Sequence, residues 1–289
     1  MDSRWSWTEE ACNDEPVSRL GVGFTEEWKH FRLERADNIA TLTFNRPDKL
    51  NALTFQAYAD LRDLLAELPH RNDTRVLVLH GEGRGFCSGG DVNEIIGLTL
   101  RMGTDQLLAF TRMTGEVVRA MRECPVPIVA ALHGMTAGAG AVLALAADFR
   151  IATPSAKFAF LFTKVGLSGA DMGAAYLLPR MIGVGRATEL LMLGDTLDAE
   201  TAERYGLVSQ LVPEEALSER VTMLARRLAD GPFQAYASTK AVISRELDMG
   251  LSASLELDAT TQALLMHGED YREFHAAFTG KRPPKWQGR

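Results

Sequence analysis

Cysteine is scarce in this sequence, and its placement excludes the sites that depend on it. The 289 residues include three cysteines, Cys12, Cys87 and Cys124. Their spacing matches no CxxC pair or zinc-ligand pattern, and an odd number does not complete a disulfide framework. We therefore expect free thiols in a reducing cytoplasm and no metal site built on cysteine.

Positive charge is also in short supply. The chain has 31 Lys and Arg residues against 38 Asp and Glu, a formal net charge of -7. Proteins that bind nucleic acids need a strongly basic surface, so the sequence predicts no nucleic-acid partner. A local basic patch for a phosphorylated small molecule remains compatible with this composition.

No uninterrupted apolar run is long enough to suggest a membrane segment. The longest, Pro125 to Ala147, is broken by Pro127, His133 and several glycines, and it suits a buried strand, turn and helix. The N-terminus lacks a basic stretch followed by an apolar one, so no signal peptide is expected. We predict no membrane association.

Strand-like and helix-like segments alternate along most of the chain. Residues 1–25 resemble a polar, acidic extension, residues 26–210 form the expected core, and residues 211–289 form an expected helical oligomerisation subdomain. Strands are expected at 39–44, 75–81, 127–134, 148–153, 157–160 and 206–213. Helices are expected at 54–69, 104–122, 172–181, 184–193, 198–205, 214–229, 233–246, 252–267 and 268–278. This order predicts an α/β core followed by a helical tail.

Two buried strands each end in a glycine-rich segment. "HGEGRGFCSGGDV" (80–92) follows the first and "HGMTAGAGAVLA" (133–144) follows the second. Such strand ends can expose backbone N–H groups, and two of these aimed at one oxygen make an oxyanion hole. Neither segment has dinucleotide or P-loop glycine spacing, and the chain has no GxSxG or HExxH motif. The alternative is that these glycines only permit tight turns and close helix packing.

Four motifs together resemble the crotonase superfamily, the enoyl-CoA hydratase and isomerase group. They are "NRPDKLNALT" (45–54), "GRGFCSGGDV" (83–92), "PVPIVAALHGMTAGAGAVLALAADFRIA" (125–152) and "LLMLGDTLDAETAERYGLVSQLVP" (190–213). The resemblance covers roughly residues 28 to 286. It implies a crotonase-like spiral of ββα units, an acyl-CoA substrate, a homotrimer or dimer of trimers, and oxyanion-hole donors at the N–H groups of Ser88 and Ala139.

The residues differ from the family's hydratases at two positions. Matching the motifs places the two catalytic glutamates of those enzymes at Val142 and Phe162, and neither side chain can transfer a proton. In "KVGLSGADMGAAYLLPR" (164–180), Asp171 matches the aspartate of the family's epoxyacyl-CoA and dienoyl-CoA isomerases, with one extra residue before it. In apolar surroundings its pKa would rise and suit proton shuttling. The alternative role is to cap the following helix.

The resemblance also implies which residues hold coenzyme A. The implied contacts are Lys49, Leu50, Ala52, Cys87, Gly89, Gly90, Asp91, Val92, Phe278 and Lys281, the last two often supplied by a neighbouring subunit. Among these, Asp91 is expected to fix its turn rather than perform chemistry. His133 ends a buried strand, where we expect a core histidine with its hydrogen bonds satisfied; it is the first alternative if Asp171 is not the base.

We therefore predict an enzyme that stabilises a thioester enolate and moves a double bond, with Asp171 as the single proton shuttle. No separate cofactor and no metal are expected, because coenzyme A is part of the substrate. The alternatives are a hydratase using atypical residues, an acyl-CoA hydrolase, and a catalytically silent acyl-CoA binder.

Overall fold

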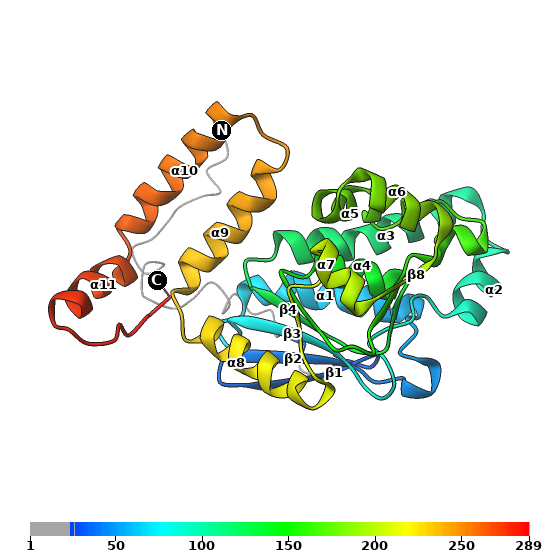
Figure 1. Ribbon diagram of the computed structural model, residues 1–289, viewed down its shortest axis with the longest axis horizontal. Coiled ribbons are helices and arrows are strands. Elements are labelled where there is room, and N and C mark those ends of the chain that lie inside the picture. The colour runs from blue at the N-terminus through cyan, green and yellow to red at the C-terminus, as the bar shows by residue number, and fades with distance from the viewer. Residues whose placement is uncertain (1–23, 26, 289) are drawn as a thin grey trace, which may run out of the picture.

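The computed structural model of the protein describes residues 24–25 and 27–288 (Figure 1). The expected N-terminal extension, residues 1–25, therefore lies outside the described residues except for Phe24 and Thr25. Among the helices that are described, none combines the length and the apolar character needed to cross a membrane.

A six-stranded sheet forms the centre of the protein. Its strand order is β1-β2-β3-β4-β6-β9, with β1 antiparallel to β2 and the others parallel. The strands are β1 (Arg32–Ala36), β2 (Ile39–Phe44), β3 (Val76–Gly81), β4 (Ile128–Leu132), β6 (Phe149–Ala152) and β9 (Gln210–Leu211). Parallel strands bring the ends of β3 and β4, and hence both glycine-rich segments, to one edge.

Side-chain alternation gives this sheet two different faces. Along β2, the side chains of Ala40, Leu42 and Phe44 share one face, as the sequence predicts, and lie in the main core. That core also contains α1 (Phe55–Glu67), α3 (Thr104–Glu123) and α4 (Ala139–Ala146). β3 and β4 are apolar on both faces because a second cluster covers their other side.

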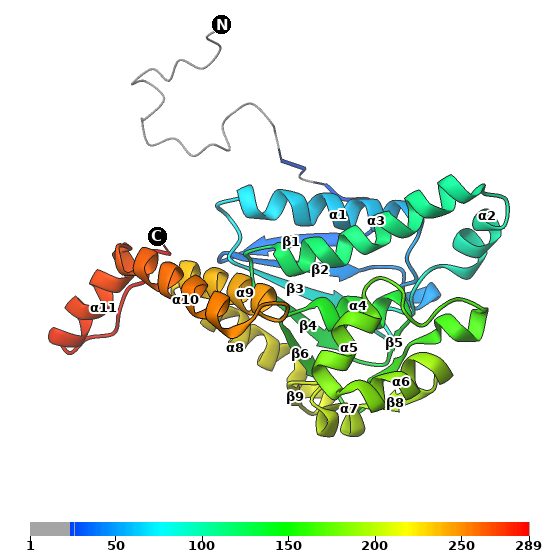
Figure 2. The same ribbon diagram turned by 90° about the horizontal axis from the view of Figure 1, so that it is seen from above.

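Helix α8 (Leu217–Ala229) covers that second face (Figure 2). Its apolar residues, among them Val221 and Leu228, pack against Val76, Val78 and Val129. The sequence placed this helix in the C-terminal subdomain that begins at residue 211. In the structure α8 belongs to the core, because the sheet would otherwise expose an apolar face. The next helix, α9 (Phe233–Glu246), still contacts the core through the buried Lys240, which donates to the Val126 carbonyl.

A smaller sheet of β5 (Met135–Ala137), β7 (Lys157–Ala159) and β8 (Thr196–Asp198) completes the α/β core. The helices around it are α5 (Ala174–Ile182), α6 (Val184–Leu193) and α7 (Ala199–Tyr205); a short α2 (Gly97–Thr99) follows the first glycine-rich segment. The strand expected at 206–213 shortens to β9. Leu207 and Val208 are buried in the core before β9 begins, and the Leu207 carbonyl accepts from Arg150 instead of a neighbouring strand.

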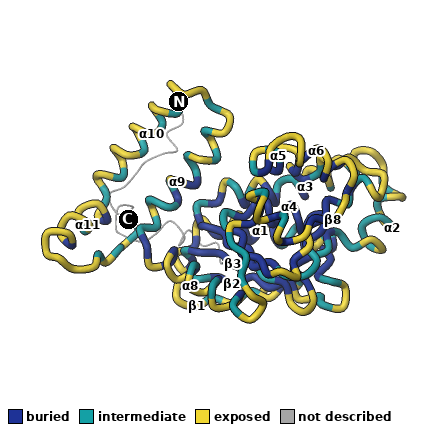
Figure 3. The backbone as a smooth tube through the Cα atoms, in the orientation of Figure 1, coloured by how far each residue is buried: buried dark blue, intermediate teal, exposed yellow. Residues whose placement is uncertain are grey.

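The last three helices extend away from the core (Figures 1 and 2). They are α9 (Phe233–Glu246), α10 (Leu251–Met266) and α11 (Glu269–Thr279). No residue of α10 is buried, and Figure 3 shows this region mostly as exposed surface. Leu251, Leu255 and Leu264 are 75%, 58% and 69% exposed. The leucines of α1, by contrast, are buried within the same chain.

The approach of α4 to the first glycine-rich segment provides a test of the fold. A β-carbon on Gly140 would lie 2.2 Å from the Cys87 carbonyl oxygen, so Gly140→Ala must push two backbone segments apart. We expect the melting temperature to fall by at least several degrees, since overpacking of this kind costs roughly 1–3 kcal/mol or more. Gly115→Ala in α3, where nothing lies within 4 Å, is the control and should raise stability slightly. Equal melting temperatures for wild type and Gly140→Ala would contradict this packing.

Candidate active site

The two glycine-rich segments interlock through their backbones. The Cys87 N–H donates to the Met135 carbonyl at 3.1 Å, and the Ala137 N–H donates to the Cys87 carbonyl at 2.9 Å. Gly89 has a φ of 102°, and a β-carbon there would lie 3.3 Å from the Ala139 nitrogen. The segments therefore meet at Ala139, and at Gly89 both the left-handed backbone and the close approach favour glycine.

Ala139 presents a backbone N–H at the start of a helix. It is the first residue of α4, and the carbonyl four residues earlier, that of Met135, accepts from Cys87 instead. First-turn N–H groups have no partner within the helix and carry the positive end of its dipole. This group is therefore suited to a negatively charged oxygen.

The N–H of Ser88 differs from the expected free donor. It donates to the Leu50 carbonyl at 3.0 Å. The cause is local: Leu50 has a φ of 48° and Asn51 a φ of 57°, so the chain turns back toward the 87–92 segment. A ligand oxygen can receive the Ser88 N–H only if the hydrogen is shared or the Leu50 carbonyl moves.

Most of the expected coenzyme A contacts lie together. The segment containing Lys49, Leu50 and Ala52 runs beside residues 87–92, joined by the Leu53 N–H to the Gly89 carbonyl and the Asp91 N–H to the Leu53 carbonyl, both at 2.8 Å. Phe278 and Lys281 do not join them. Both lie at the end of α11, at the opposite end of the molecule from α2 in Figures 1 and 2.

Asp91 fixes its turn, as the sequence indicates. One carboxylate oxygen accepts the N–H groups of Asn93 and Glu94, and the other accepts from Arg46 at 2.9 Å. Burial works in the opposite direction, but these hydrogen bonds hold the pKa of Asp91 below its ordinary value. The neighbouring Cys87 is fully buried, and burial raises its pKa to about 12, so it remains a thiol and packs rather than reacts.

Asp171 lies in the loop before α5. The loop is held by close packing: a β-carbon on Gly169 would lie 2.2 Å from the Leu191 carbonyl oxygen, and Met172 is buried. Met172 has a φ of 49°, an unfavourable backbone conformation for this residue. The cap of α5 is Gly173, with no side-chain hydrogen bond, so the alternative capping role of Asp171 is wrong.

The surroundings of Asp171 suit proton transfer. Its carboxylate accepts one hydrogen bond, from the Met172 N–H at 2.9 Å. Burial raises the pKa of Asp171, and that hydrogen bond lowers it less. Val142 and Phe162 are buried in the same core as Met172 and Ala139. The two hydratase glutamate positions therefore hold hydrocarbon in the same core as Met172, the residue that follows Asp171.

Two further residues contribute to this region and were not singled out from the sequence. Asn51 is buried, and its side-chain amide donates to the carbonyls of Glu82 and Gly85 at 2.9 and 2.8 Å, which fastens the first glycine-rich segment. Tyr58 lies on the buried face of α1, and burial, followed by the charges of Cys87 and Asp171, raises its pKa. The helical periodicity at 54–69 indicates that Tyr58 is buried, but not what its hydroxyl faces.

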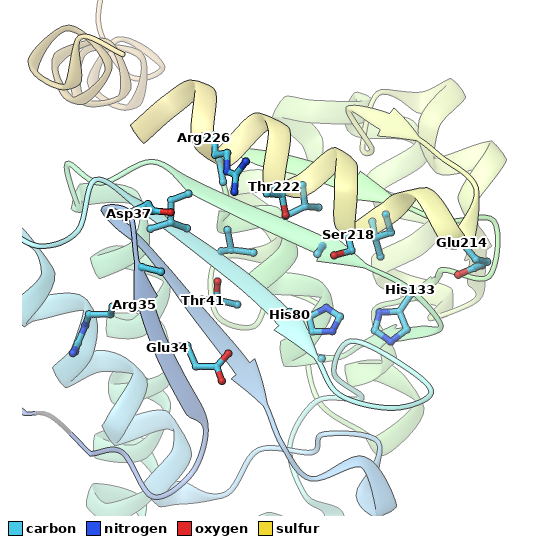
Figure 4. A pocket seen from close by; sticks show the side chains of 18 of the residues that line it. Glu34, Arg35, Asp37, Thr41, His80, His133, Glu214, Ser218, Thr222 and Arg226 are labelled. Atoms are coloured by element: carbon cyan, nitrogen blue, oxygen red, sulfur yellow. The ribbon is translucent and has the colours of Figure 1, made fainter. Parts of the chain in front are cut away.

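His133 lies on the other side of the sheet. It continues the alternation of β4 beyond Val129 and Ala131, which face α8, and it stacks on His80 with ring centroids 5.4 Å apart. Its Nε2 donates to the Gly83 carbonyl at 3.0 Å. Both histidines line a pocket of about 630 Å³ between the sheet and α8 (Figure 4). His133 is therefore separated by the sheet from Ala139 and Asp171.

Comparisons of sequence and of structure both relate the chain to enoyl-CoA hydratases and isomerases. The family model described as enoyl-CoA hydratase/isomerase matches residues 34–289. The 1,2-epoxyphenylacetyl-CoA isomerase of Escherichia coli K12 is 38% identical over 251 residues, covering 87% of this chain and 95% of that protein. The trans-2-decenoyl-[acyl-carrier-protein] isomerase of Streptococcus mutans is 32% identical, covering 89% and 98%. A Streptomyces coelicolor A3(2) crystal structure, assigned as an enoyl-CoA hydratase, is 70% identical with a TM-score of 0.91, covering 93% and 98%. These structural matches confirm the crotonase fold predicted from the sequence.

The position of His133 yields a prediction. His133→Ala removes its hydrogen bond to Gly83, which typically contributes about 1 kcal/mol, so the melting temperature should fall by a few degrees. Turnover per folded molecule should fall far less than the roughly hundredfold expected when an acid–base group is lost. The measurement is kcat on an enoyl-CoA alongside a thermal melt. A hundredfold loss of kcat in a folded variant would place His133 in the chemistry.

Proposed function

The chain belongs to the enoyl-CoA hydratase/isomerase family, and from this premise we propose that it moves a double bond within an acyl-CoA thioester, using Asp171 to transfer the proton. The observation that carries this proposal is the setting of Asp171. Its carboxylate is half-buried with a pKa raised by burial, whereas the two hydratase glutamate positions hold Val142 and Phe162.

The proposed reaction removes and returns one proton. The Asp171 carboxylate takes a proton from the α- or γ-carbon of the acyl group, which leaves an enolate or dienolate conjugated with the thioester. The resulting carboxylic acid then returns a proton to the other end of the conjugated system. One acid–base group is sufficient, because the same carboxyl group can remove the first proton and return the second.

The enolate oxygen needs hydrogen-bond donors that strengthen as charge develops. We propose that the Ala139 N–H is the first donor, since it begins α4 without a partner in the helix. The Ser88 N–H is the second donor once it is shared with, or released by, the Leu50 carbonyl. Loss of one such donor typically costs roughly 3 kcal/mol of transition-state stabilisation.

Two-glutamate hydration is disfavoured on the same grounds. Adding water across a double bond requires a group that deprotonates the water and one that protonates carbon, and Val142 and Phe162 can do neither. Asp171 alone suits proton relocation better. Hydration by atypical residues, hydrolysis and silent binding remain distinguishable by assaying 3-enoyl, 2-enoyl and saturated CoA thioesters in parallel.

The substrate is proposed to lie along the 49–52 and 87–92 segments, with no cofactor beyond its own coenzyme A, because proton relocation transfers no electrons to an external acceptor. Phe278 and Lys281 are proposed to reach the nucleotide of a neighbouring subunit.

The buried Cys87 and Cys124 are free thiols, which supports a reducing compartment, and we propose the cytoplasm.

Replacement of Asp171 tests the proposed proton transfer. Asp171→Asn keeps the acceptor for the Met172 N–H, so binding of the thioester should stay near the wild-type value while kcat falls roughly a hundredfold or more. Exchange of substrate α- and γ-hydrogens with deuterated water should stop. In the wild-type enzyme the base must be ionised, so activity should fall as pH drops through the raised pKa, at higher pH than for an ordinary aspartate near about 3.9.

Retention of turnover and exchange by the Asn variant would contradict the assignment of Asp171. The variant is informative because its side chain has the same size and Gly173, not residue 171, caps α5. A thermal melt should show the wild-type fold.

The assembly is proposed to be a trimer or a dimer of trimers. The support is the exposure of Leu251, Leu255 and Leu264 on α10 and the distance of Phe278 and Lys281 from their own chain's site. Light scattering should give a mass three or six times that of the 31.7 kDa chain. Leu251→Glu combined with Leu255→Glu should lower that mass without loss of the core fold. A stable wild-type monomer at micromolar concentration would contradict the proposal.

A further inference from the structure

Tyr58 is a buried residue whose hydroxyl group the proposed reaction does not use. Tyr58 is 4% exposed, on the face of α1 that packs against α3. Its hydroxyl oxygen lies 3.6 Å from the position that a β-carbon on Gly90 would occupy. Gly90 follows Ser88 by two residues, so this hydroxyl adjoins the segment that carries the proposed second donor.

Within the described part of the chain, no hydrogen bond reaches this hydroxyl. The charges of Cys87, in the first glycine-rich segment, and of Asp171, the proposed base, both act on the pKa of this hydroxyl. The hydroxyl oxygen keeps some access to solvent, since it is not one of the fully enclosed polar atoms that lack a partner, and tyrosine hydroxyls beside an apolar ring usually find a partner at this polar end. The partner is therefore expected to come from whatever occupies the space between these elements.

Tyr58 acts as a donor rather than as a second base. Burial raises the pKa of Tyr58 well above its ordinary value, and the nearby Cys87 and Asp171 raise it further. The phenol consequently keeps its proton throughout the range in which the enzyme would work. What it can offer a substrate is an O–H aimed at an acceptor oxygen.

The surroundings of Tyr58 suit a flat acyl group. The Phe110 ring meets the Tyr58 ring edge-on, with centroids 6.0 Å apart, and lies 4.5 Å from the Phe55 ring. Aromatic side chains pack well against planar, apolar groups. An aryl acyl group packed on the Phe110 ring would therefore lie next to the Tyr58 side chain.

We propose that Tyr58 donates a hydrogen bond to an oxygen atom carried by the acyl group, and that it selects aryl acyl-CoA substrates bearing a ring hydroxyl or epoxide oxygen over unsubstituted ones. This inference rests on the proposed function, because it needs an acyl group placed between the 87–92 segment and Asp171. It concerns which acyl group binds, not how the proton moves. The E. coli relative is named for an epoxide-bearing aryl acyl-CoA, in keeping with such a site.

Two unreactive thioesters test the selection without requiring turnover. Phenylacetyl-CoA and 2-hydroxyphenylacetyl-CoA differ by one ring oxygen, and their dissociation constants can be measured by titration calorimetry on the assembled wild-type enzyme. We expect the hydroxylated thioester to bind about tenfold more tightly, the usual effect of one hydrogen bond to an otherwise unpaired group. Tyr58→Phe should remove that difference while leaving phenylacetyl-CoA binding within about twofold of wild type.

A matched control removes a hydroxyl group elsewhere. Tyr205→Phe lies on α7, on the opposite side of the molecule from α1 in Figure 2, where the Tyr205 ring contacts Arg186. This variant should keep the wild-type preference. Thermal melts of both variants should match wild type, since each change removes a single oxygen.

The possible outcomes separate the two proposals. Equal binding of both thioesters to the wild type would overturn the role of Tyr58 and leave the reaction proposed for Asp171 intact. A preference that persists in Tyr58→Phe would assign it to another residue and also overturn the role of Tyr58; this includes the case in which the hydroxyl holds only a water molecule. Failure of both thioesters to bind the wild type would overturn the acyl-CoA site itself and this inference with it.

Discussion

The whole site depends on a backbone-to-backbone contact between two segments, at positions where an added side chain would not fit. The Ala137 N–H donates to the Cys87 carbonyl where the segments that follow β3 and β4 meet, and Gly140 approaches the same carbonyl so closely that a methyl group would overlap it. The contact fixes where α4 begins and where its first N–H group points. Because main-chain atoms supply the donor, the side chains around it are free to be small and apolar, which explains the uncharged composition of residues 136–147.

Around this contact, the chemistry relies on a few polar groups in hydrocarbon surroundings. Burial raises the pKa of both Asp171 and Tyr58 and so favours their neutral forms. The consequences for the two groups differ. A carboxyl group with a raised pKa can give a proton back as readily as it takes one, whereas a phenol with a raised pKa only donates a hydrogen bond. Similar environments therefore suit one group to proton transfer and the other to recognition. The packing of Gly169 on Leu191 and the burial of Met172 hold this loop in place and maintain the unfavourable φ of Met172.

The sequence predicted what depends on periodicity and on motif order. The alternation of Ala40, Leu42 and Phe44, the glycine-rich ends of β3 and β4, and the helices from residue 174 onward all follow from local pattern. It could not predict contacts decided by three-dimensional packing. The assignment of α8 depends on which face of the sheet remains uncovered, and the same strand alternation places His133 away from the site. The capping role considered for Asp171 failed because Gly173 adopts the left-handed conformation that ends the loop.

The hydrogen bond from the Ser88 N–H to the Leu50 carbonyl affects how tightly the enzyme binds the enolate relative to the substrate thioester. In the empty enzyme this partly buried donor is satisfied by a neutral carbonyl of the protein itself. When a substrate thioester arrives, one neutral carbonyl replaces another, so this exchange adds little to the affinity for the ground state. An enolate oxygen carries negative charge and forms a stronger, charge-assisted bond to the same N–H. Because the Leu50 carbonyl already satisfies this N–H, only the charged intermediate gains free energy when it takes the place of that carbonyl. Binding energy accelerates a reaction when it is gained in this selective way.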